Sequence, residues 1–67
     1  MNVLINNIPY ELPENATAPA VLQAMNIISD RGVALAINNN VVPRSEWSAC
    51  IIAEGDKVTL IKATQGG

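Results

Sequence analysis

Short segments in which large apolar residues alternate with small or polar ones make up most of this chain. They are NVLIN at 2–6, IPYEL at 8–12, VALAIN at 33–38 and KVTLIKA at 57–63, with a brief VV at 41–42. Such alternation is typical of β-strands that bury one face. Only the stretch at 17–32 spaces its apolar residues as a helix does. A chain with this pattern can build one sheet and cover one face of it with one helix.

Turn signals separate the alternating segments. Asn6-Asn7 joins the first two segments into a predicted hairpin, the triple asparagine at 38–40 marks a second turn, and Gly55 can take the positive φ of a third. Pro9 has no N–H to donate to a neighbouring strand, so we expect the second strand at a sheet edge.

The helical stretch has recognisable boundaries. Thr17 is a suitable N-cap, and Pro19 is tolerated in the first turn, where its N–H would have no partner in any case. Val21 and Leu22 begin an apolar face that the spacing extends to Ile28, and Gly32 is a natural residue to end the helix. We therefore predict a helix of roughly ten residues.

The sheet is predicted to be mixed, with the last strand beside the first, which gives an α+β fold. Six large residues should then face the helix: Val3, Ile5, Leu35, Ile37, Val58 and Leu60. The residues of opposite parity should point away from it: Leu4, Ala34, Ala36, Thr59 and Ile61. No other segment is left to cover this apolar or small face, so we interpret it as a docking surface for a partner, with a minor role for Lys62.

Groups suited to catalysis are scarce. The chain has no histidine, which is the commonest general base, and no Gly-rich phosphate loop. Cys50 is the only cysteine and lies in SACIIA among small and apolar residues, so we expect a buried structural thiol. A single thiol cannot form an internal disulfide or build a zinc site. We predict no catalytic residue and no metal ligand in the chain itself.

The charge balance also limits the partners. Four basic and six acidic residues give a net charge of −2, with no cationic stripe for nucleic acid or an anionic membrane. No apolar run approaches the roughly 20 residues of a membrane span, and MNVLINNIPY lacks the positive charge of a secretory signal. We expect a cytoplasmic protein that binds neither nucleic acid nor membrane.

The sequence ends with IKATQGG, which places two glycines directly after a predicted strand. Glycine loses more conformational freedom on folding than any other residue, so it is poorly suited to holding a chain end in place. We expect residues 1–64 to form the folded domain and residues 65–67 to form a flexible tail. Gln65, Gly66 and above all Gly67 would then be exposed and chemically available.

Several of these motifs occur together in one known family. ALAINNNVVPRSEW at 34–47, EGDKVTLI at 54–61 and the final Gly-Gly resemble the ThiS family of sulfur carriers in thiamin biosynthesis. The resemblance covers nearly the whole chain and is weakest in the helical stretch, which carries Pro19 and few acidic residues. It implies the β-grasp, ubiquitin-like fold: a mixed sheet of four to five strands covered on one face by one helix.

The resemblance also implies a chemistry for the C-terminus. Gly67 would be adenylated by an E1-like enzyme of the ThiF type, which uses ATP and Mg²⁺. Sulfur from a donor would then convert the adenylate to a thiocarboxylate, and a thiazole synthase of the ThiG type would receive that sulfur. The carrier would bind no cofactor and would be a substrate of its partner enzymes, not an enzyme.

Other functions share these features. The small subunit of molybdopterin synthase has the same fold, Gly-Gly end and thiocarboxylate, although that family tends to be longer and richer in phenylalanine, and this chain has no phenylalanine. Thiocarboxylate carriers of other pathways remain open, as does a ubiquitin-like modifier joined to lysines through Gly67. An interaction module with an inert tail is a further alternative.

Overall fold

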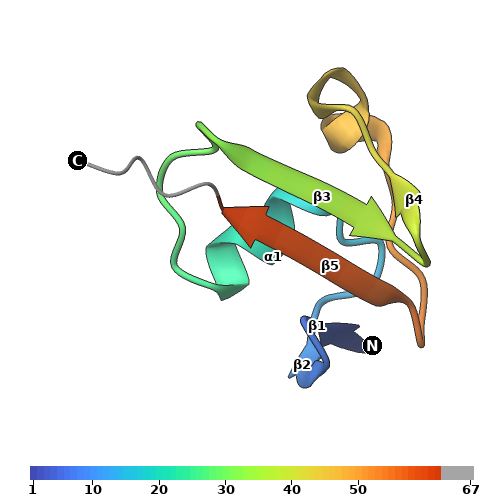
Figure 1. Ribbon diagram of the computed structural model, residues 1–67. Coiled ribbons are helices and arrows are strands. Elements are labelled where there is room, and N and C mark those ends of the chain that lie inside the picture. The colour runs from blue at the N-terminus through green and yellow to red at the C-terminus, as the bar shows by residue number, and fades with distance from the viewer. Residues whose placement is uncertain (63–67) are drawn as a thin grey trace.

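Five strands pair into one mixed sheet in the order β2-β1-β5-β3-β4 (Figure 1). The computed structural model describes residues 1–62. The strands are β1 (Asn2–Ile5), β2 (Ile8–Glu11), β3 (Val33–Ile37), β4 (Asn40–Val41) and β5 (Lys57–Lys62). Helix α1 (Ala18–Ala24) follows β2 and lies behind β3 and β5 in Figure 1, and the 3₁₀ helix η1 (Arg44–Ala49) follows β4. The predicted α+β fold is confirmed.

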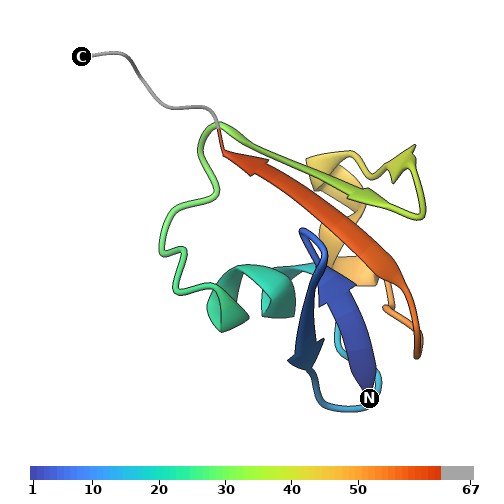
Figure 2. The ribbon, with the colours of Figure 1, turned by 60° about the horizontal axis from the view of Figure 1, so that its bottom comes forward.

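Strand pairing explains why the sheet is mixed. β1 and β5 run parallel, with Ile5 opposite Val58, whereas β5 runs antiparallel to β3, with Leu60 opposite Leu35. β2 lies at one edge, as its Pro9 requires, and β4 lies at the other. The sheet is twisted, so β1 and β3 run in clearly different directions in Figure 2. The last strand is therefore held between the first and the third.

Asparagine forms most of the tight turns. Every described residue other than glycine with a positive φ is an asparagine: Asn6, Asn7, Asn15, Asn26, Asn38 and Asn39. Asparagine tolerates this left-handed conformation better than other side chains do. The pairs at 6–7 and 38–39 make the two-residue turns between β1 and β2 and between β3 and β4, where both central residues need a positive φ.

The helix ends earlier than the sequence predicts. It spans seven residues, Met25 is its C-cap, and the next residue, Asn26, has a φ of 59°. The N–H of Asn26 donates to the Gln23 carbonyl at 3.1 Å, and the N–H of Ile27 donates to the Leu22 carbonyl at 2.8 Å. These two bonds form a Schellman motif, which terminates the helix. The predicted end at Gly32 is therefore wrong, and Ile28 is fully exposed instead of extending the apolar face.

The core lies between the sheet and the elements that cover one of its faces. The sheet contributes buried side chains from Val3, Ile5, Val58 and Leu60. Helix α1 contributes those of Val21 and Leu22. Trp47 on η1 is also buried, and its Nε1–H donates to the Val42 carbonyl at 2.9 Å. The 3₁₀ helix thus returns the tryptophan to the core. No charged or polar residue among those described is buried.

Candidate functional site

The face of the sheet that points away from α1 is apolar and open to solvent. Two cross-strand pairs form its centre, Ala34 opposite Ile61 and Ala36 opposite Thr59. Ile61 is 62% exposed, and Leu4 on neighbouring β1 is 37% exposed. All five residues that alternation assigned to this face therefore lie on it. We call this surface the outer face.

Two further residues belong to the outer face by their register. Val41 pairs with Ala36, which points outward, and the Val41 side chain is 76% exposed. Lys57 lies opposite Leu4 and has the parity of Thr59, so it provides a cation at one end of the face. Lys62 has the parity of Val58 and Leu60, so it belongs to the other side of β5, although it is exposed at the strand end. Sequence analysis did not identify Val41 or Lys57.

The outer face carries a shallow hollow of about 60 Å³. Its lining consists of Ala34, Leu35, Ala36, Val41, Thr59 and Ile61. The hollow arises because two alanines lie at its centre, while the larger Val41 and Ile61 rise beside them. Its volume and apolar lining suit one small aliphatic side chain of a partner.

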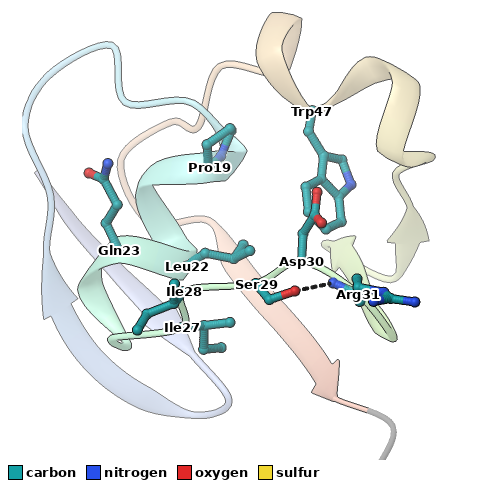
Figure 3. Close-up of a pocket in the computed structure, with 9 residues that line it drawn as sticks. All are labelled: Pro19, Leu22, Gln23, Ile27, Ile28, Ser29, Asp30, Arg31 and Trp47. Atoms are coloured by element: carbon teal, nitrogen blue, oxygen red, sulfur yellow. Dashed lines mark hydrogen bonds between the residues drawn. The ribbon is translucent and has the colours of Figure 1, made fainter.

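A larger hollow of about 580 Å³ lies on the helix side, between α1, the loop after it and Trp47 (Figure 3). Two of its polar side chains, those of Ser29 and Asp30, have partners. The N–H of Arg31 donates to the Ser29 hydroxyl oxygen at 3.3 Å, and the Asp30 carboxylate lies 3.7 Å from Nε of Arg44. This arrangement provides no nucleophile paired with a base, so the larger hollow offers no recognisable chemistry.

Within residues 1–62, no cluster of three or more histidine, cysteine, aspartate or glutamate side chains could hold a metal ion. Cys50 is half-buried against the core at the end of η1, which is less buried than the sequence indicated. No helix in the same part of the chain is long and apolar enough to span a membrane. The other residues that the sequence singled out, Gln65, Gly66 and Gly67, lie outside the described residues.

Comparison with known proteins identifies the family of this chain. The model of the ThiS family matches residues 3–67. The chain belongs to the ThiS family. The sulfur carrier protein ThiS of Escherichia coli (strain K12) is 31% identical to it over 67 residues, which cover the whole of both chains.

Solved ThiS structures agree with the fold. The crystal structure of the thiamine biosynthesis protein ThiS from Geobacter metallireducens shares 25% identity with this chain, with a TM-score of 0.81, and covers the whole of both chains. A solution structure of a thiamine biosynthesis protein from the same organism gives the same identity and TM-score, and 88% of that chain is covered. The predicted β-grasp architecture, with a mixed sheet and one covering helix, is confirmed for this ThiS-family chain.

Proposed function

We propose that this chain is a sulfur carrier of thiamin biosynthesis, in which the carboxyl group of Gly67 is adenylated and then converted to a thiocarboxylate. The observation that carries the proposal is the match to the ThiS family model, which runs through Gly67. The E. coli relative, itself named a sulfur carrier protein, is matched over its whole length. The chain supplies the acyl group, and partner enzymes supply the catalysis.

The chemistry needs two steps because a carboxylate is a poor acceptor for sulfur. In the first step, a carboxylate oxygen of Gly67 attacks the α-phosphorus of ATP, the bond from that phosphorus to pyrophosphate breaks, and an acyl-adenylate forms. In the second step, a sulfur nucleophile at the oxidation level of sulfide attacks the acyl carbon, and AMP leaves with the electron pair. One carboxylate oxygen is thereby replaced by sulfur. Splitting one difficult step into two easier ones is the general logic of covalent activation.

In this proposal the adenylating partner holds both ATP and Mg²⁺. That partner is an E1-like enzyme, which would stabilise the charge that develops on the phosphates. A thiazole synthase would then take the sulfur from the thiocarboxylate. Glycine at 66 and 67 would let the backbone pass close to a nucleotide without a side chain in the way.

Docking on the outer face would bring the Gly67 carboxyl to the partner. The outer face includes Ile61, which lies six residues before Gly67, so docking there and entry of the tail into a pocket can occur together. Anchoring the body in this way makes the reaction of the tail effectively intramolecular. The hollow between Ala34 and Ala36 would receive an aliphatic side chain of the partner, and Lys57 would pair with an acidic group at the rim.

Intact-mass spectrometry tests the proposal. After incubation with ATP, Mg²⁺, the adenylating enzyme and a sulfur donor, the mass should change by one oxygen replaced with sulfur, and C-terminal fragments should place the change on Gly67. Locating the change is essential because oxidation of Met1 or Met25 alters the mass by nearly the same amount. An unchanged mass in the presence of a competent adenylating enzyme would refute the proposal.

Two variants sharpen the test. Cys50→Ala removes the only cysteine, so an alkylating reagent should then label this variant only after sulfur transfer. Loss of transfer in folded Cys50→Ala would indicate instead that a persulfide on Cys50 carries the sulfur. Deleting Gly66 and Gly67 should abolish the modification while the circular dichroism spectrum stays unchanged, since residues 1–62 form the sheet and its core.

The alternatives predict different products. A molybdopterin synthase small subunit would support molybdopterin formation with the large subunit of that enzyme, whereas this proposal expects thiazole formation with thiazole synthase. A ubiquitin-like modifier would give isopeptide-linked conjugates through Gly67 in a cell extract, and a sulfur carrier would give few or none.

A further inference from the structure

The second half of β5 leaves its ladder with β1 before the strand ends. The register between these parallel strands stops at Ile5 opposite Val58, because β1 turns away into β2 at Asn6. The tip of that hairpin meets the middle of β5, as the turned view shows (Figure 2). Leu60 therefore has no residue of β1 opposite it.

The side chain of Asn6 takes the place of the missing strand residue. Its Oδ1 accepts the N–H of Leu60 at 2.8 Å, and its Nδ2 donates to the carbonyl of Leu60 at 3.1 Å. The backbone N–H of Asn6 also donates to the carbonyl of Val58 at 2.9 Å. We call these three bonds the Asn6 clamp. A side-chain amide carries the same donor and acceptor as a peptide group, so the clamp extends the ladder by one residue.

A comparable arrangement holds the other end of β5. Asn38, in the turn between β3 and β4, accepts the N–H of Lys57 on its Oδ1 at 3.0 Å and donates its own N–H to the Lys57 carbonyl at 2.8 Å. The strand is thus held at its start from one side by Asn38 and near its end from the other side by Asn6. Asn7 shares the turn with Asn6 and has a positive φ, but it contributes no atom to the clamp.

We propose that Asn6 is a positioning residue for sulfur transfer, whose side chain fixes the end of β5 and so directs the C-terminal carboxyl toward the partner's pocket. This inference rests on the proposed function. Leu60 lies seven residues before Gly67, and the five residues after Lys62 can span up to about 17 Å when extended. The position of the end of β5 therefore sets the region that the Gly67 carboxyl can reach. Without the clamp, β3 alone would hold the last residues of β5.

The clamp should act on the turnover number and not on docking. Asn6 contributes no side chain to the outer face, and Thr59 and Ile61 on β5 stay paired with Ala36 and Ala34 of β3 when the clamp is lost, so every docking side chain is retained. A looser β5 lowers the fraction of docked carriers whose carboxyl is in position, which lowers kcat. A purely structural role predicts a different pattern: a partly unfolded carrier lowers the concentration of docking-competent chain, so the apparent KM rises while kcat at saturation is unchanged.

Glycine substitutions provide a matched set because glycine accepts the positive φ of each turn position. In Asn6→Gly, we expect kcat for adenylation of the carrier to fall about three- to tenfold with KM within about twofold of wild type. Hydrogen exchange of the Leu60 amide should be about fivefold faster or more in the same variant. Asn7→Gly should change neither quantity. Asn38→Gly should speed exchange at Lys57 and leave kcat unchanged.

Each other outcome overturns the inference. An unchanged exchange rate at Leu60 in Asn6→Gly would show that the clamp does not protect the strand. Faster exchange with wild-type kcat, or a raised KM with wild-type kcat, would show that the clamp has no part in presenting the carboxyl.

If Asn6→Gly does not fold, Asn6→Asp provides the same test. The aspartate keeps the acceptor for the Leu60 N–H and loses the donor to the Leu60 carbonyl, so a fall in kcat is again required. If a competent enzyme does not adenylate the wild-type chain, the proposed function itself is refuted. If the wild-type chain is adenylated and Asn6→Gly has the same kcat, only the positioning role is refuted.

Discussion

Ile61→Ala should weaken docking of the carrier to its adenylating partner by about tenfold while leaving the fold largely intact. The substitution removes three carbons, which on complete burial are worth about 2.4 kcal/mol at 0.8 kcal/mol each. Because Ile61 is 62% exposed in the free chain, about 1.5 kcal/mol of that total remains to be gained on docking. A loss of this size corresponds to about a tenfold change in the dissociation constant.

The buried part of Ile61 contributes to the fold instead. It accounts for about 0.9 kcal/mol, so the free energy of unfolding should fall by no more than about 1 kcal/mol. Docking is measured as the KM for the carrier in pyrophosphate release by the adenylating enzyme. The free energy of unfolding is measured separately, by urea denaturation. At saturating carrier, kcat should equal that of wild type, since Ile61 takes no part in the chemistry.

Ile28→Ala is the matched control. It makes the same chemical change at a fully exposed isoleucine that borders the larger hollow on the helix side, away from the outer face. We expect its KM to match that of wild type. If Ile28→Ala raised KM and Ile61→Ala did not, docking would occur at the hollow between α1 and Trp47, and our assignment of the outer face would be wrong.

Substitutions at two further positions test the elements that support the fold. Position 26 has a φ of 59° after the helix, a conformation that glycine accepts and alanine does not. Asn26→Gly should therefore raise the free energy of unfolding by a few tenths of a kcal/mol, and Asn26→Ala should lower it by about 1 kcal/mol. Equal stability of the two variants would contradict this explanation. Trp47→Phe should lower the free energy of unfolding by about 1 kcal/mol or more, because the Val42 carbonyl loses the indole N–H that it accepts at 2.9 Å; an unchanged midpoint in denaturant would refute that role.

Alternation and turn chemistry were sufficient to predict the sheet. In β5, Val58 and Leu60 are buried while Thr59 and Ile61 lie on the outer face, as a period of two requires. The register had little freedom because the asparagine pairs at 6–7 and 38–39 fix where each hairpin turns. A shift of one residue would move Ile61 into the core and Leu60 into solvent, so burial itself selects the observed pairing.

The end of α1 could not be predicted because the sequence offers two residues that accept a left-handed conformation. Asn26 and Gly32 are both suitable, and the apolar Ile27 and Ile28 between them continue a helical spacing. The structure selects Asn26, and half-buried Ile27 then packs against the core while Ile28 stays in solvent. Such a choice depends on the path that the chain must take to reach β3, which local sequence does not determine.

The candidate site was predictable in its centre and not at its margins. Ala34, Ala36, Thr59 and Ile61 follow from parity within long strands, but VV at 41–42 is too short to show which valine points outward. Pairing of Val41 with Ala36 settles the question. The bonds of Asn6 to Leu60 join positions 54 residues apart, so they become visible only once the hairpin tip is placed against β5.

β5 combines three functions because its side chains and its two edges point in different directions. Val58 and Leu60 contribute to the core, Thr59 and Ile61 contribute to the outer face, and the main chain is held from both sides. A strand placed at an edge of the sheet could present a face, but its end would be held by one neighbour alone. The central position of the last strand is therefore what allows a chain of 67 residues to fix both the outer face and the start of the segment that leads to Gly67.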